Sequence, residues 1–154
     1  MTATGRAARA KGHRAERAVV AFLRANGHPE AATTRHRLGH DGFHAPGDIA
    51  GVPGLVIEVK DVAASAFPTW CRQAEEEAQG TPWCVVRRQP GVTDVGAWPC
   101  VASLDAIAGP VHHSPLSLIQ IVRRIDALPA GHWLAGRDGW AAGHFRDLFD
   151  GTQA

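Results

Sequence analysis

The sequence has few cysteines, no long apolar run and almost no net charge. Its three cysteines, Cys71, Cys84 and Cys100, are odd in number and form no CxxC pair, which argues against a secreted disulfide framework. No stretch approaches the roughly 18 consecutive apolar residues of a membrane-spanning helix. The basic, alanine-rich start has no apolar run that would indicate a signal peptide. We therefore expect a soluble, cytoplasmic protein that does not associate with a membrane.

The charge is balanced in total but not along the chain. A formal net charge of +1 over 154 residues, taken alone, lowers the expectation of a nucleic-acid partner. Residues 1–40 nevertheless hold eight basic and two acidic residues, a local +6, and the remainder carries −5. Such an asymmetry is typical of a basic binding face. Only two of the 16 basic residues are lysines, Lys11 and Lys60, while the excess of Arg and Ala is typical of a GC-rich genome, actinobacterial or phage.

The first element that the pattern predicts is a helix over residues 11–26, closed by Gly27. Residues 1–10 are expected to form a flexible basic arm. At helical spacing, Glu16 falls inside the apolar stripe of this helix, where an unpaired carboxylate would be costly. The stripe consists of Ala15, Val19, Val20, Phe22 and Leu23.

The remaining pattern predicts one α/β (α+β) domain with a mixed central β-sheet flanked by helices. We expect the element order αβββαββ in a core domain over residues 11–109, and a C-terminal accessory region over residues 110–154 that is helical and packed on the core. Strands 48–50 and 55–60 pair most simply as a hairpin. The expected strands are 32–37, 48–50, 55–60, 83–87 and 98–103, and a second helix covers 69–79.

One constellation has the spacing of a catalytic site, namely Asp48 followed by Glu58-Val59-Lys60. Strand alternation places Glu58 and Lys60 on the same face, and hairpin pairing brings Asp48 beside Glu58. Two adjacent carboxylates repel unless a cation lies between them, and oxygen ligands select a hard ion such as Mg²⁺ or Mn²⁺. A neighbouring ammonium can orient or help deprotonate an attacking water. The alternative is an ordinary acid and lysine on an exposed strand face.

These residues resemble a known family. Pro46-Gly47-Asp48 with Glu58-Val59-Lys60 resembles the PD-(D/E)XK nuclease superfamily, with one residue inserted between the proline and the aspartate. The longer run, from Lys11 through Glu16 and the basic strand to Glu58-Val59-Lys60, is similar to archaeal-type and phage Holliday junction resolvases. The resemblance covers roughly residues 11–103 and implies a restriction-endonuclease-like core.

The resemblance also implies a role for each matching residue. Asp48 and Glu58 would bind Mg²⁺ or Mn²⁺, assisted by the backbone carbonyl of Val59. Lys60 would position or activate the hydrolytic water, and Glu16 would hold a metal-bound water or a second ion.

Gln73 lies on the helix after the core strands, where such nucleases often carry a glutamine near the site; an ordinary helix residue is the alternative. Five basic residues flank the site in sequence and are expected to contact DNA phosphates. They are Lys11, Arg14, Arg17, Arg35 and Arg37.

The implied activity is that of an Mg²⁺-dependent endodeoxyribonuclease, a hydrolase that cleaves phosphodiester bonds in branched DNA during DNA recombination or repair. A four-way junction has two scissile strands related by a two-fold axis, so a homodimer is expected. Two alternatives stay open. The same site could serve a restriction-like, nicking or repair nuclease, or the chain could be a non-catalytic DNA-binding module on a nuclease fold.

Overall fold

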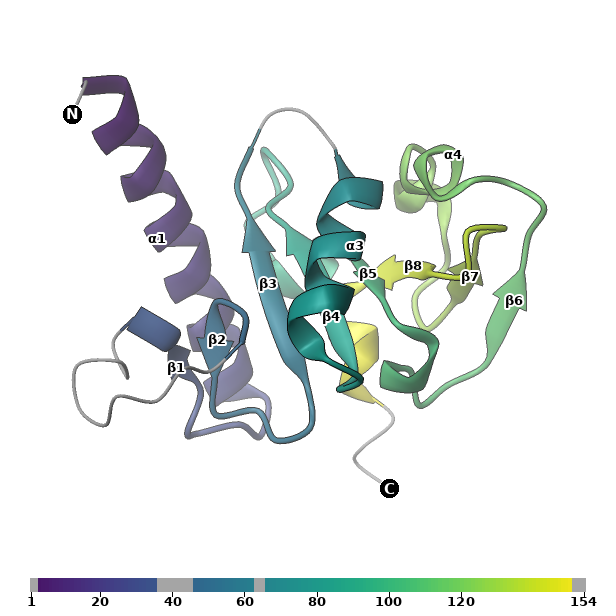
Figure 1. Ribbon diagram of the computed structural model, residues 1–154, viewed down its shortest axis with the longest axis horizontal. Coiled ribbons are helices and arrows are strands. Elements are labelled where there is room, and N and C mark those ends of the chain that lie inside the picture. The colour runs from purple at the N-terminus through teal and green to yellow at the C-terminus, as the bar shows by residue number, and fades with distance from the viewer. Residues whose placement is uncertain (1–2, 36–45, 63–65, 151–154) are drawn as a thin grey trace.

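A computed structural model describes residues 3–35, 46–62 and 66–150. Eight strands form one sheet, with α1 on one face and α3 and α4 on the other (Figure 1). The predicted class, a mixed α and β fold with a central mixed sheet, is confirmed. The helices are α1 (Ala3–Ala25), α3 (Phe67–Ala78) and α4 (Leu118–Val122), with 3₁₀ turns at η1 (Val95–Ala97), η2 (Leu104–Ala106), η3 (Ile125–Ala127) and η4 (Phe145–Leu148). None of these helices is both long and apolar enough to cross a membrane.

The sheet has the order β1-β2-β3-β4-β5-β8-β7-β6. Two pairs are parallel, β3 with β4 and β6 with β7, and the other pairs are antiparallel. Ile49 on β2 lies opposite Ile57 on β3, which confirms the predicted hairpin. The strands are β1 (Ala32–Thr33), β2 (Ile49–Ala50), β3 (Val56–Lys60), β4 (Trp83–Arg87), β5 (Pro99–Ala102), β6 (Val111–His113), β7 (Trp133–Ala135) and β8 (Ala141–His144).

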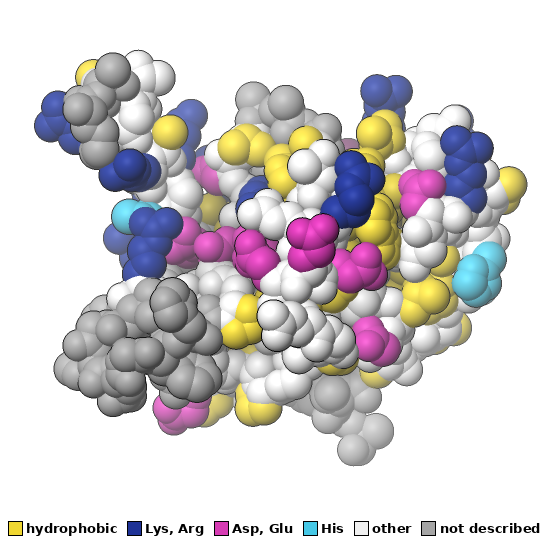
Figure 2. All heavy atoms as spheres, in the orientation of Figure 1, with side chains coloured by type: hydrophobic (Ala, Val, Ile, Leu, Met, Phe, Trp, Pro, Cys, Tyr) yellow, Lys and Arg dark blue, Asp and Glu magenta, His cyan; other side chains and the backbone are white. Residues whose placement is uncertain are grey.

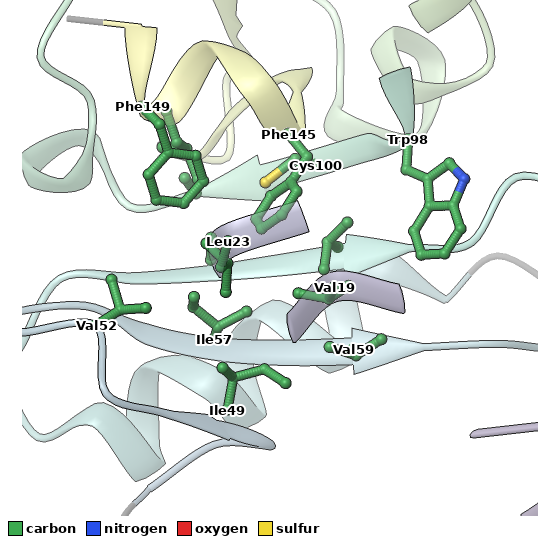
Figure 3. Close-up of a cluster of buried hydrophobic side chains, with 14 of the residues drawn as sticks. Val19, Leu23, Ile49, Val52, Ile57, Val59, Trp98, Cys100, Phe145 and Phe149 are labelled. Carbon is green, nitrogen blue, oxygen red and sulfur yellow. The ribbon is translucent and has the colours of Figure 1, made fainter. Parts of the chain in front are cut away.

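The alternation of β3 divides its side chains between two apolar cores. Ile57 and Val59 pack toward α1 in the first core, together with Leu23 and Phe145 (Figure 3). Val56 belongs to the second core, which lies under α3 and α4. Because side chains alternate along a strand, Glu58 and Lys60 lie on the α3 side of the sheet, as the pattern predicts.

The N-terminal segment differs from its prediction. α1 begins at Ala3 instead of residue 11, so the expected flexible arm is wrong for residues 3–10, which are helical. This segment is mainly alanine and arginine, two residues of high helix propensity. It has no apolar stripe, and the prediction from residue 11 depended on such a stripe. As predicted, Ala15, Glu16, Val19, Val20 and Leu23 are buried.

The predicted strand over residues 32–37 is too long. β1 covers only Ala32–Thr33, and Thr34 begins a helical turn. The Thr34 hydroxyl donates a hydrogen bond to the Gly47 carbonyl oxygen at 3.0 Å. The Thr34 side chain is thereby bonded to backbone that lies 13 residues later in sequence, just before β2, at the point where β1 stops pairing.

The C-terminal part is not a helical accessory region. Its strands β6, β7 and β8 belong to the same sheet as the core, and β8 pairs directly with β5. A helix does form around Leu118 and Ile121, but α4 is only five residues long. β7 and β8 have three and four residues, too few for a period-2 pattern to be visible in sequence. The expected boundary between residues 109 and 110 therefore has no counterpart in the sheet.

Candidate functional site

Asp48, Glu58, Lys60 and Gln73 line one open cavity of about 940 Å³ between the start of β2, the end of β3 and helix α3. Four of the residues predicted for catalysis, which are up to 25 positions apart in sequence, are therefore brought together. Figure 2 shows acidic side chains in a row across the middle of this face of the molecule, beside basic side chains over α1.

The backbone around Gly47 fixes the position of Asp48. Gly47 has φ +82°, and a Cβ at this position would lie 2.7 Å from the Ile57 carbonyl oxygen, so only glycine fits without a shift. The Asp48 amide donates to the same carbonyl oxygen at 2.8 Å. The Val59 amide in turn donates to Asp48 Oδ2 at 2.8 Å. This glycine is the residue inserted into the Pro-Asp motif, and it lets the backbone lie against β3.

The hydrogen bond from Val59 also orients the Val59 carbonyl. In an extended strand the N–H and C=O groups of one residue point to the same side. Because the Val59 amide points toward Asp48, its carbonyl oxygen also faces the Asp48 side of β3. The Val59 carbonyl, one of the predicted ligands, thus faces the side of β3 on which Asp48 lies.

Glu58 is a buried carboxylate with only partial compensation. It is 8% exposed, and its Oε2 atom lies 3.3 Å from Lys60 Nζ. Burial, followed by the charge of Asp48, raises the pKa of Glu58 to about 7, although the Lys60 ion pair acts in the opposite direction. Burial and the neighbouring Asp48 thus disfavour the charged form of Glu58 more than Lys60 favours it, and a bound cation would favour that charged form.

Glu16 lies next to this cavity, not in it. Its side chain is buried and lines a neighbouring cavity of about 620 Å³ together with His13, Arg17 and Arg35. Burial, followed by the charge of Asp48, raises the pKa of Glu16. Asp48 thus interacts electrostatically with both glutamates, with Glu58 on β3 and with Glu16 on α1.

Within the described residues, no group of three or more His, Cys, Asp or Glu side chains is arranged to hold a metal ion. Two carboxylates and the Val59 carbonyl are nevertheless enough for Mg²⁺, which binds proteins through one or two carboxylates, keeps several waters and takes further oxygens from a substrate phosphate. The residues fit an ion that is completed by water and substrate, and they do not form an all-protein cage.

Thr34 and Glu77 are among the cavity residues that were not predicted from the sequence. Thr34 is buried, and its backbone amide donates to the Asp48 carbonyl oxygen at 2.9 Å, in addition to the hydroxyl bond to Gly47. Glu77 lies one helical turn after Gln73 and accepts a hydrogen bond from Gln73 Nε2 at 3.3 Å. The four-residue spacing of Gln73 and Glu77 could have indicated the second residue. Thr34 has no comparable signal in the sequence.

The predicted DNA-binding residues lie along α1 and at its cavity. Lys11, Arg14 and Arg17 are exposed on α1. Arg35 is also exposed, and its guanidinium is hydrogen-bonded to the His13 ring. Arg37 lies outside the described residues.

Comparisons of the chain with protein-family models, with curated proteins and with solved structures found no match. A functional assignment therefore rests on the residues of the two cavities and on their geometry.

Proposed function

We propose that the protein is an Mg²⁺-dependent endodeoxyribonuclease that cleaves branched DNA, as a Holliday junction resolvase does. One observation carries the proposal: Asp48 and the Glu58-Val59-Lys60 run meet in one cavity from two paired antiparallel strands. Glu58 is buried there beside a second carboxylate and a lysine. An ordinary acid and lysine on an exposed strand face would stay in water, and the carboxylate would not bear the free-energy cost of burial.

The surrounding elements support a restriction-endonuclease-like core. Helix α1 packs on the β1-β2-β3 edge, and α3 connects β3 to the parallel strand β4. This arrangement gives the acid-x-lysine strand a neighbour on each side and leaves its polar face open toward α3. The three added strands β6, β7 and β8 lie on the far side of β5, away from the cavity.

The chemistry follows from the positions of the charges. A bound Mg²⁺ would supply Lewis-acid stabilisation of the charge that develops on the scissile phosphate. Asp48, Glu58 and the Val59 carbonyl would hold this ion. The Lys60 ammonium, kept at the cavity by Glu58, would orient a water for in-line attack on phosphorus and stabilise it as it loses its proton. Hydrolysis would leave a 5′-phosphate and a free 3′-hydroxyl.

Glu16 is not proposed as a direct ligand of the ion held by Asp48 and Glu58. It lines the neighbouring cavity but interacts with Asp48, so it would act on the ion through a water, or would hold a second ion. Gln73 shares the cavity and would contact the substrate phosphate or a bound water, with its amide oriented by Glu77.

Cleavage of a four-way junction tests the proposal. The purified chain is incubated with a four-way junction and with a linear duplex of the same sequence, in Mg²⁺ or in EDTA. We expect symmetric cleavage of the junction in Mg²⁺ alone. For Asp48→Asn, which keeps the size and one acceptor of the side chain, we expect a loss of at least about 100-fold, because electrostatic contacts to the transition state of this type contribute 10²–10³-fold.

Asp61→Asn is the matched control. Asp61 follows Lys60 directly in sequence, but it pairs with Arg88 at 3.4 Å. The cleavage activity of the Asp61→Asn variant should therefore stay close to that of the wild-type chain. Equal cleavage of the linear duplex would favour the restriction-like or nicking alternative. Tight DNA binding without any cleavage would favour the non-catalytic module and overturn the proposed enzyme.

A further inference from the structure

The first half of α1 extends beyond the core of the protein. The buried residues of this helix begin at Ala15, and none of residues 3–14 is buried. At 1.5 Å per residue these twelve residues are about 18 Å long. Figure 1 shows the N-terminal half of α1 leading away from the sheet. A helical segment is thus held out into solvent from the same helix that carries Glu16.

The charge of this segment is suited to a polyanion and does not favour the start of a helix. Residues 3–14 contain four basic residues and no acid, and their only aliphatic side chains are alanines. Basic side chains near a helix N-terminus oppose the helix dipole. Gly12, in the middle of the segment, costs about 1 kcal/mol relative to alanine, although a Cβ would meet no atom within 4 Å there. The charge therefore does not stabilise the helix itself.

The basic residues continue into the cavity of Glu16. With 3.6 residues per turn, Arg6, Arg9, His13 and Arg17 fall within a stripe about 80° wide, which we call the basic stripe. His13 and Arg17 at its inner end line the Glu16 cavity together with Arg35. The basic stripe spans about 16 Å from Arg6 to Arg17, which corresponds to about five base pairs of duplex DNA at 3.4 Å each.

We infer that the basic stripe binds the phosphate backbone of a duplex arm of the substrate, about five base pairs away from the cleavage site. The identity of the polyanion as DNA rests on the proposed function, while the charge, length and direction of the stripe are independent of it. Alanine side chains offer too little apolar area for insertion into a lipid surface, so an anionic membrane fits the segment less well.

Binding measured in EDTA tests this inference without cleavage. The full chain carrying Arg6→Gln and Arg9→Gln is compared with one carrying Arg123→Gln and Arg124→Gln, two exposed residues that follow α4 at the other end of the sheet. The two variants have the same net charge. We expect the stripe variant alone to bind a four-way junction roughly 2- to 30-fold more weakly. Its slope of log K against log salt should flatten by about 2, because two phosphate contacts are lost.

Two further measurements fix the interpretation. An Arg6→Lys and Arg9→Lys variant keeps the charge and should restore binding, which separates lost contacts from a lost helix. Shortening the duplex arms so that they end within about five base pairs of the cleavage site should abolish the difference between the stripe variant and the wild-type chain.

Equal binding by the stripe variant and the remote variant would overturn the inference. So would a stripe variant that loses affinity for phosphatidylserine vesicles while its affinity for DNA is unchanged. A chain that binds DNA through the stripe but never cleaves would leave this inference standing and overturn the proposed nuclease. If the chain cleaves DNA but the stripe variant binds and cleaves as the wild-type chain does, the proposed nuclease stands and this inference is overturned.

Discussion

The two sides of the sheet are built differently. On the side of β4, β5 and β8, all four residues of β5 are buried, and this strand has a paired neighbour on each side. On the side of β1 and β2, each strand has two residues, and the buried side chains include Glu16, Thr34 and Glu58. We call the half of the sheet that contains β4, β5 and β8 the apolar side, and the half that contains β1 and β2 the polar side.

The comparison indicates a division of labour. The apolar side gains free energy of folding from burial, which is worth roughly 25 cal/mol per Å² of apolar surface. The polar side holds carboxylates whose burial opposes folding unless they are protonated or paired with a cation. Removing a buried apolar side chain on the apolar side should therefore lower stability, whereas removing the charge of a buried carboxylate on the polar side should raise it.

Phe145→Ala should have the largest effect on stability. Phe145 is fully buried and lies against Phe22 and Phe149, with ring centroids 5.4 and 5.2 Å away. We expect the free energy of unfolding to fall by about 3–5 kcal/mol, the usual cost of such a cavity. Urea unfolding measures it, with Leu104→Ala as the control because Leu104 is 43% exposed. A change below about 1 kcal/mol would contradict the assignment of stability to the apolar side.

Glu58→Gln should change stability in the other direction. In the folded chain the pKa of Glu58 is raised from 4.5 to about 7, so the folded state holds a proton that the unfolded state has released between these values. Stability therefore falls as pH rises through this window and levels off above it. In EDTA at pH 8 the glutamine variant should be more stable than the wild-type chain, by up to about 3 kcal/mol.

Urea unfolding at pH 5.5 and pH 8 measures this difference, and Glu76→Gln, an exposed position on α3, serves as the control. Mg²⁺ should stabilise the wild-type chain at pH 8 more than it stabilises the Glu58→Gln variant, because the variant lacks one of the proposed ligands. Parallel stability curves for the two chains would show that Glu58 does not carry the buried charge.

The sequence was informative where residues follow a period or a motif. Two short strands on either side of the Pro53-Gly54 turn predicted the hairpin, and the alternation of Val56 to Lys60 predicted the face of the sheet that carries Glu58 and Lys60. The buried position of Glu16 followed from its angle on the helix. These features depend on local geometry, which a single strand or helix already contains.

Contacts between distant segments were not predictable in the same way. The strands β6 to β8 have three or four residues each and are specified by pairing with one another and, through β8, with β5, not by their own pattern. Thr34 acts through hydrogen bonds to residues 13 and 14 positions later, so its role depends on a loop closure that no local spacing indicates. The placement of Glu16 in a neighbouring cavity likewise depends on how α1 crosses β1.

Thr34→Val should have the smallest effect on stability and a larger one on activity. The variant keeps the shape of the side chain but removes the hydroxyl that bonds the Gly47 carbonyl oxygen at 3.0 Å. We expect a loss of about 1–2 kcal/mol in the free energy of unfolding, since one partly buried acceptor loses this hydrogen bond. Because Gly47 and Asp48 are held by these bonds, junction cleavage should fall by about tenfold or more, as small misplacements of catalytic groups do.

Thr34→Ser is the matched control, since it keeps the hydroxyl and loses only a methyl group. Cleavage by the serine variant should be close to that of the wild-type chain, while the valine variant stays slow even when Mg²⁺ is saturating. If instead the serine variant loses activity and the valine variant keeps it, then packing of the Thr34 methyl group, and not its hydrogen bond, holds Asp48 in place. The polar side would then depend on apolar contacts in the same way as the apolar side, and the division between them would not hold.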